Sequence, residues 1–274
     1  MATRVTFIGA GNMASAIIGG MIDSGFSPSA ITATSPSDAF LAPVHERYGI
    51  HTNTDNVAAV AQADVVVLAV KPQIMKEVCE GLAGVVQRQR PLIISVAAGL
   101  DAATLEAWLG GSLPLVRCMP NTPALVGAGA SGLYANASVS DEQRALATEL
   151  MEAVGLVEWV EEERLLDAVT AVSGSAPAYF FLMFEAMEEA GVSLGLPAET
   201  ARRLAMQTAF GAAKMAMASD KPPAELKRNV MSPGGTTERA VEHLEAAELR
   251  RILAEAMDAC AARAREMAAE LGGR

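Results

Sequence analysis

Cysteine and histidine are both scarce in this chain of 274 residues, with 3 of each. The cysteines, Cys79, Cys118 and Cys260, are odd in number and far apart, which argues against a disulfide framework and against a cysteine-based zinc site. The histidines lie in unrelated segments without the spacing of a metal-binding motif, so we assign no metal. This usage fits a protein of the reducing cytosol best.

Basic residues are also in deficit, because 21 Lys and Arg stand against 32 Asp and Glu and give a formal net charge of −11. Nucleic acids and anionic membranes are bound by clustered cations, so we expect neither as a partner. The apolar stretch at 5–22 contains glycines and an asparagine and is too polar to span a membrane. We therefore expect a cytoplasmic protein that meets any anionic ligand with local groups.

Hydrophobic residues make up 51% of the chain and charged residues 19%, which excludes intrinsic disorder. Up to about residue 160, short β-branched runs alternate with helical stretches, as in a doubly wound parallel sheet of the α/β class. The expected strands are 5–8, 30–34, 64–70, 92–96 and 115–118, and the expected helices are 14–24, 39–48 and 102–109.

Beyond residue 160 the strand-like runs disappear, and the sequence predicts an all-helical second domain. We therefore divide the chain into domains 1–160 and 161–274. The expected helices are 164–172, 178–190, 198–218, 238–245 and 248–271. The stretch 178–184 is apolar on every side, which a helix on the surface of a monomer does not sustain. More than one neighbour must bury it, so we expect at least a dimer.

A G-x-G-x-x-A motif begins at Gly9, directly after a predicted strand and at the start of a predicted helix. This context is typical of a dinucleotide site, in which backbone amides and the positive end of the helix dipole bind phosphates. The alternative is a plain glycine-rich turn. The expected cofactor-binding backbone is that of Gly9, Ala10, Gly11, Asn12 and Met13.

The nature of the dinucleotide depends on the end of the second strand, where NAD enzymes usually offer a carboxylate to the ribose. Here Thr34, Ser35 and Ser37 offer small hydroxyl groups instead, which leaves room for a 2′-phosphate and favours NADPH. Asp38 is close by and no arginine follows immediately, so use of NADH remains open.

Two further strand ends are expected at the same edge of the sheet, where open α/β sheets bind ligands. A lysine at a helix N-terminus opposes the helix dipole, which is easier to understand if a ligand sits beside it, although an exposed lysine costs little. The small residues after the next strand admit a flat ring. The residues concerned are Ala69, Val70, Lys71 and Pro72 after one strand, and Ala97 and Ala98 after the other.

The segment 232–237, Ser-Pro-Gly-Gly-Thr-Thr, offers backbone amides and hydroxyl groups without any charge. Such a nest suits a small carboxylate. The alternative is an ordinary helix cap made by Thr236 or Thr237. For the segment 174–177, Gly-Ser-Ala-Pro, the simpler interpretation is a helix start with Ser175 as its cap.

Six segments, taken together and in order, resemble the pyrroline-5-carboxylate reductase family. They are 9–13 (GAGNM), 69–72 (AVKP), 96–99 (VAAG), 117–123 (RCMPNTP), 171–175 (AVSGS) and 232–237 (SPGGTT). The resemblance implies a Rossmann domain, a helical domain that interlocks with a second subunit to complete shared active sites, and dimers that often assemble into decamers. It implies reduction of 1-pyrroline-5-carboxylate to L-proline by NAD(P)H, the last step of proline biosynthesis. One departure is Ala176, where the family usually has glycine.

The resemblance also assigns residues to the two ligands. It places Ser35, Asn56, Lys71 and Asn229 at the nucleotide. It places the substrate carboxylate on Ser232, Gly234, Gly235, Thr236 and Thr237, and Thr237 is the candidate hydrogen-bond partner of the ring nitrogen. An iminium ion can arrive already protonated, so reduction needs no strong acid, in keeping with a sequence that offers no histidine or carboxylate constellation.

Two other functions stay open on the sequence. A hydroxyacid dehydrogenase shares the Rossmann-plus-helical plan but uses a catalytic lysine on a long helix, for which Lys214 is the candidate. A nucleotide-sensing protein would bind NADPH without turnover. Oxidation of NADPH in the presence of pyrroline-5-carboxylate separates both from the reductase.

Overall fold

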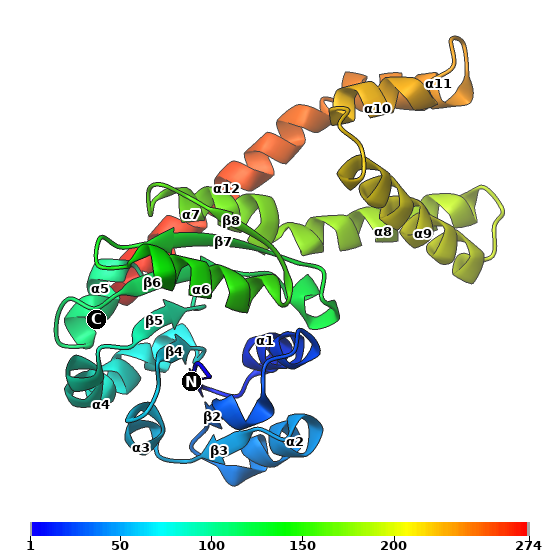
Figure 1. Ribbon diagram of the computed structural model, residues 1–274. Helices are drawn as coiled ribbons and strands as arrows, with labels where there is room; N and C mark the ends of the chain where they lie inside the picture. The colour runs from blue at the N-terminus through cyan, green and yellow to red at the C-terminus, as the bar shows by residue number, and fades with distance from the viewer. Residues whose placement is uncertain (1, 273–274) are drawn as a thin grey trace. The chain divides into compact units, whose positions relative to one another are not determined.

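The computed structural model describes residues 2–272 and divides the chain into two compact units (Figure 1). The first unit contains Met1–Ser175 together with Ala259–Arg274, and the second contains Ala176–Asp258. The sheet belongs to the first unit, and the second is helical. This bears out the predicted fold class.

The sheet of the first unit has eight strands in the order β3-β2-β1-β4-β5-β6-β7-β8. All neighbouring strands pair in parallel except β6 and β7, which are antiparallel. Strand order reverses beside β1, and ligands of open α/β sheets bind outside the carboxyl ends of the strands at such a switch point. The strands are β1 Val5–Ile8, β2 Ile31–Thr34, β3 His51–Asn53, β4 Val65–Leu68, β5 Leu92–Ser95, β6 Leu115–Met119, β7 Gly129–Ala135 and β8 Gly155–Trp159.

Helices cover both faces of this sheet, so its central strands are buried throughout (Figure 1). Successive side chains of a strand point to opposite faces. Phe7 accordingly packs in the cluster that includes side chains of α1 and α6, whereas Ile8 packs in the cluster of α4 and α5. The helices are α1 Asn12–Asp23, α2 Asp38–Tyr48, α3 Asn56–Val60, α4 Pro72–Gln89, α5 Ala102–Trp108, α6 Asp141–Glu152 and α7 Leu165–Val169.

Several elements of the first unit escape the sequence analysis. Strands β3, β7 and β8 lack long β-branched runs, and α3 has only 5 residues. Helix α6 is not among the expected helices, although the capping box of Ser140 and Gln143 is a helix-start signal in the sequence. Two short 3₁₀ helices, η1 (Pro28–Ala30) and η2 (Thr122–Val126), also appear. The expected helix 164–172 is split, because α7 continues as a π-helix, η3 (Thr170–Gly174).

The second unit is built from α8 Ala176–Ser193, α9 Ala198–Met217, α10 Pro223–Val230, α11 Thr236–Ala246 and the start of α12 Leu249–Gly272. Helices α8 and α9 form an antiparallel hairpin that closes at Gly195, whose φ is +98°. Gly191 allows the two helices to pack closely, because a Cβ built there would lie 2.8 Å from the Cβ of Ala201. The ion pair of Arg202 with Glu188, 2.7 Å, joins the two helices at their surface.

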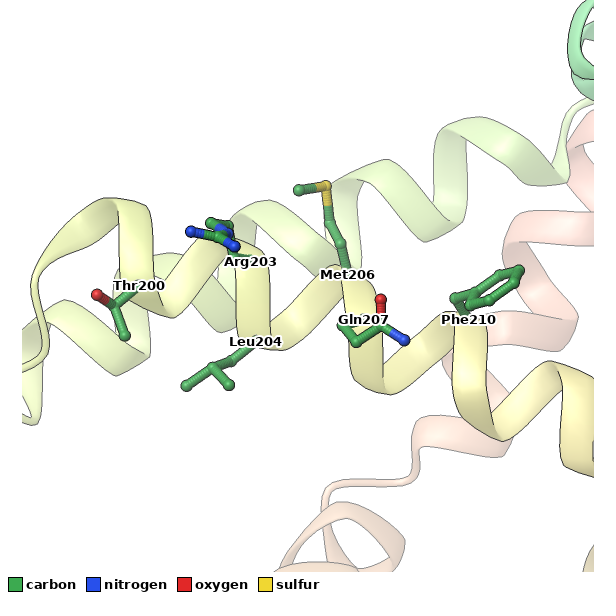
Figure 2. Close-up of a pocket in the computed structure, with 6 residues that line it drawn as sticks. All are labelled: Thr200, Arg203, Leu204, Met206, Gln207 and Phe210. Atoms are coloured by element: carbon green, nitrogen blue, oxygen red, sulfur yellow. The ribbon is translucent and has the colours of Figure 1, made fainter.

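Large apolar side chains remain exposed on this hairpin, including Phe180, Phe181 and Phe210, each more than 60% exposed. A hollow of about 560 Å³ lies on α9, and Figure 2 shows the side chains that line it. One helix alone supplies the residues that line it, Thr200, Arg203, Leu204, Met206, Gln207 and Phe210. An apolar face of this extent marks a surface that a partner covers.

The helical stretch Leu165–Ser193 is long and apolar enough, by length and composition, to cross a membrane. This is weak evidence, because a core helix of a soluble protein passes the same test. The stretch includes the π-helix η3, so it is not one uniform α-helix.

Candidate active site

The turn after β1 requires glycine at Gly9. Its φ is +104°, a conformation that residues with side chains rarely adopt, and a Cβ built there would lie 2.7 Å from the carbonyl oxygen of Ala69. The Gly9 N–H donates to the carbonyl of Thr34 at 3.1 Å. Gly9 therefore brings the carboxyl ends of β1, β2 and β4 together at the switch point.

Gly11 is glycine for a different reason. It is the N-cap of α1 in an extended conformation, and apart from its two chain neighbours no described residue lies within 4 Å of a Cβ built there. The fold therefore has room for a side chain at this position. That room lies at the N-terminus of α1, which receives no side-chain cap from the described chain and so keeps free N–H groups and the positive end of its dipole. A cradle that a Cβ would fill fits a dinucleotide pyrophosphate.

The hydroxyl groups at the end of β2 are not equivalent. Thr34 is buried and donates to the carbonyl of Phe7 at 3.3 Å, and Ser37 accepts from the N–H of Ala39 at 3.3 Å as the cap of α2. Both hydroxyls are thus engaged in the fold. Across residues 2–272 no protein group hydrogen-bonds the side chain of Ser35, which leaves this hydroxyl for a ligand.

The remaining cofactor candidates of the first unit follow the ends of other parallel strands. Lys71 is exposed at the N-terminus of α4, Asn56 begins α3, and Ala97 is buried beyond the end of β5. Because parallel strands end at the same edge, these residues share one edge of the sheet with Gly11. Asn229 lies on α10, in the second unit.

A polar network at β6 contains residues that the sequence analysis passes over. Arg117 pairs with Glu163 at 2.9 Å, and the same Glu163 oxygen accepts from the N–H of Ala102 at 2.6 Å. Next to it a cavity of about 250 Å³ lies within the first unit. Its lining includes Ala98, Gly99, Arg117, Met119, Thr170 and Ser175.

The predicted carboxylate loop joins α10 to α11 in the second unit. Helix α11 begins at Thr236 with Gly235 as its N-cap, and no side chain of the described residues caps it. The simple threonine cap is therefore not formed. Instead, the N–H of Gly234 donates to a carboxylate oxygen of Glu238 at 2.6 Å. This loop binds a carboxylate of its own chain through its backbone.

Comparison with known proteins decides the family. A family model described as "Pyrroline-5-carboxylate reductase dimerisation" matches residues 163–267, and one described as "NADP oxidoreductase coenzyme F420-dependent" matches 4–99. The pyrroline-5-carboxylate reductase of Pseudomonas aeruginosa is 51% identical over 269 residues, which is 98% of this chain and 98% of that protein. This chain belongs to the pyrroline-5-carboxylate reductase family.

Other members of the family give the same picture. The reductase of Vibrio alginolyticus is 46% identical over 96% of this chain and 97% of its own length. The solved reductase of Coxiella burnetii is 45% identical, with a TM-score of 0.95 over 97% of this chain and 99% of that one. That of Plasmodium falciparum, solved with NADP bound, is 29% identical with a TM-score of 0.84 over 97% and 98%.

Two positions singled out by the sequence can now be placed. Ala176, where the family usually has glycine, is buried as the first residue of α8, so its methyl group is not displayed on the surface. Lys214, the candidate catalytic lysine of a hydroxyacid dehydrogenase, is an exposed residue in the last turn of α9.

If the space at Gly11 holds the pyrophosphate, Gly11→Val fills it without disturbing the fold. We expect NADPH binding to weaken at least about 10- to 150-fold, because one lost charge-assisted hydrogen bond costs about 1.5–3 kcal/mol. Fluorescence titration with NADPH measures the affinity, and circular dichroism with a thermal melt checks the fold. Unchanged NADPH affinity in a folded variant would contradict the placement of the pyrophosphate at Gly11.

Proposed function

We propose that this chain reduces 1-pyrroline-5-carboxylate to L-proline, the last step of proline biosynthesis, with NADPH bound along the carboxyl edge of the sheet. The observation that carries the proposal is the vacant Cβ position of Gly11 before α1, in a chain that matches family members over nearly its whole length. Oxidation of NADPH on addition of pyrroline-5-carboxylate, with proline as the product, tests it. The absence of turnover would overturn it.

The cofactor is held mainly by backbone groups. Amides from Gly9 to Met13 face the pyrophosphate, Ser35 lies toward the adenosine ribose and its 2′-phosphate, and the strand ends at Ala69 to Pro72, Ala97 and Ala98 receive the nicotinamide half. Asn56 and Asn229 add side-chain contacts. NADH is the weaker alternative, because Ser35 offers a hydroxyl where NAD enzymes usually offer a carboxylate.

A nicotinamide bound at this edge would supply a hydride to the imine carbon, and the C=N π electrons would then become the lone pair of the proline nitrogen. The iminium nitrogen already carries its proton, so the protein need not supply an acid. Its contribution is to orient the imine carbon against the ring and to bind the carboxylate.

The loop containing Ser232, Gly234, Gly235, Thr236 and Thr237 binds that carboxylate. The support is the bond from the Gly234 N–H to the Glu238 carboxylate, which is the same donor and acceptor chemistry within the chain. Thr237 is in the first turn of α11, and its hydroxyl oxygen accepts from the N–H of the iminium ring. The proline product would be held by the same loop.

The substrate loop lies in the second unit and the cofactor edge in the first. We infer a homodimer in which the loop of one subunit completes the cofactor site of its partner, with dimers assembling into a decamer in the cytoplasm. The exposed apolar face of α8 and α9 and the dimerisation family model over 163–267 support the association. Residues 1–160 then act as the nucleotide-binding domain and 161–274 as the substrate-binding and dimerisation domain.

The choice of cofactor can be shifted at Ser35. We expect Ser35→Asp to lower the ratio of kcat/KM for NADPH to that for NADH by about 10-fold or more, because a carboxylate repels the 2′-phosphate and bonds the ribose hydroxyls. The matched control is Ser37→Asp, since aspartate also caps a helix and its carboxylate stays engaged with α2. Equal ratios in both variants and wild type would place the recognition elsewhere.

The mechanistic residue is Thr237. We expect Thr237→Val to bind NADPH normally and to lose about 10- to 150-fold in turnover, the value of one hydrogen bond to a charged group. An equal fall in kcat and kcat/KM means that the bond forms in the transition state, whereas a rise in KM alone restricts Thr237 to carboxylate binding. If Thr237→Val has wild-type kinetics, Thr237 has no role in substrate binding or catalysis, and the loop only starts helix α11.

Shared sites predict complementation between two inactive variants. Co-expressed Gly11→Val and Thr237→Val subunits form mixed dimers in which one of two sites combines an intact cofactor edge with an intact loop. We expect about a quarter of wild-type activity from random pairing, whereas sites contained in one chain give none. Light scattering of the same sample gives the size of the assembly and tests the decamer.

A further inference from the structure

Asn121 joins three elements of the first unit by both ends of its side chain. Its amide Nδ2 donates to the carbonyl of Ser173 at 3.0 Å, and its Oδ1 accepts from the N–H of Ala130 at 2.9 Å. The residue is 8% exposed and follows the carboxyl end of β6, while Ser173 belongs to the π-helix η3 and Ala130 to β7. A buried amide with both groups bonded is strongly fixed in place.

The sequence explains why the Ser173 carbonyl needs this donor. In an α-helix the carbonyl of Ser173 would accept from the N–H four residues later, but that residue is Pro177, which has no N–H. The chain forms a π-turn here, in which the N–H of Ser175 donates to the carbonyl of Thr170 at 2.8 Å. The carbonyl left over by Pro177 is the one that Asn121 binds.

The π-helix lies against the edge that receives the nicotinamide. A Cβ built at Gly174 would lie 2.5 Å from the methyl group of Met119, so η3 packs directly on the end of β6. The cavity of about 250 Å³ is lined by Ala98 and Gly99 from the end of β5 and by Thr170 of the π-helix. π-Turns of this kind are frequent at functional sites.

We propose that Asn121 is a positioning residue for hydride transfer, which holds the π-helix at a fixed distance from the carboxyl ends of β5 and β6. This rests on the proposed function, because it takes the nicotinamide to lie at that edge. Asn121 does not touch the reacting atoms. It fixes the wall beside them, and a misplacement of about 1 Å is enough to cost about 100-fold in rate.

The test is Asn121→Asp, which keeps the size of the side chain and the acceptor for Ala130. It replaces the donor facing Ser173 with a carboxylate oxygen that repels the carbonyl. We expect kcat to fall about 10- to 100-fold with little change in NADPH affinity. We also expect a larger kinetic isotope effect than in wild type when the transferred hydrogen of NADPH is replaced by deuterium, because hydride transfer becomes the slow step.

The pH profile gives a second readout that a loss of stability alone would not produce. Protonation of the introduced carboxyl group restores a donor toward Ser173, so the kcat of Asn121→Asp relative to wild type should recover as the pH falls. Asn121→Ser, which is too short for the bond but adds no charge, should lower kcat without this recovery. Asn121→Ser also tests the proposal if Asn121→Asp fails to fold.

Asn136 offers a matched control at the far end of the same strand pair. Its Nδ2 donates to the carbonyl of Leu113 at 2.8 Å and to a carboxylate oxygen of Glu106 at 3.0 Å, and its Oδ1 accepts from the N–H of Leu115 at 3.2 Å. Asn136 is therefore also held by both ends of its side chain, away from the proposed ring site. Asn136→Asp should lower the thermal midpoint and leave kcat and the isotope effect as in wild type.

Two results would overturn the proposal. One is a folded Asn121→Asp enzyme with wild-type kcat and isotope effect, and the other is an equal loss of kcat in Asn136→Asp. Either leaves the proposed function standing, provided that the wild-type enzyme reduces pyrroline-5-carboxylate. If the wild type shows no such reduction, the proposed function fails before Asn121 is at issue.

Discussion

The close approach of Gly9 to the carbonyl oxygen of Ala69 is the constraint on which the cofactor edge depends. It requires a residue with no Cβ and a positive φ at the end of β1, and it brings β1 and β4 together where the strand order reverses. From there the chain can turn at once into α1, whose N-terminus lies at that edge. Any larger residue at Gly9 would separate the strands that carry the cofactor candidates.

An acidic protein that acts on two anionic ligands has to attract them without excess positive charge. In the proposed sites, uncharged donors offset the net charge of −11 locally, first the N-terminal amides of α1 and then the loop before α11. Backbone N–H groups at the positive end of a helix dipole act at short range and are little affected by the distant acidic surface. The Gly234–Glu238 bond shows this chemistry within the chain itself.

The second unit has little core of its own. Its buried hydrophobic side chains are small, Ala176, Ala201 and Ala205 among the described residues, while phenylalanines on α8 and α9 stay exposed. Burial of such side chains contributes about 1.5–3 kcal/mol each, so the proposed association would stabilise the unit that contains the proposed substrate loop. Folding of the second unit, assembly of the subunits and completion of the proposed site are then coupled.

The sequence by itself determined the parallel sheet, the dinucleotide turn, the helical second half and the family, because strand periodicity, the spacing of Gly9 and Gly11 and the ordered motifs are local patterns. Only the tertiary structure distinguished Ser35 from the engaged hydroxyls of Thr34 and Ser37, and only it placed Asn121 on the carbonyl of Ser173. Pro177 shows in the sequence that the carbonyl of Ser173 lacks its helical donor, but the donor that replaces it, Asn121, lies 52 residues from Ser173. Such a pairing depends on how β6 and the π-helix pack, and no local pattern encodes that.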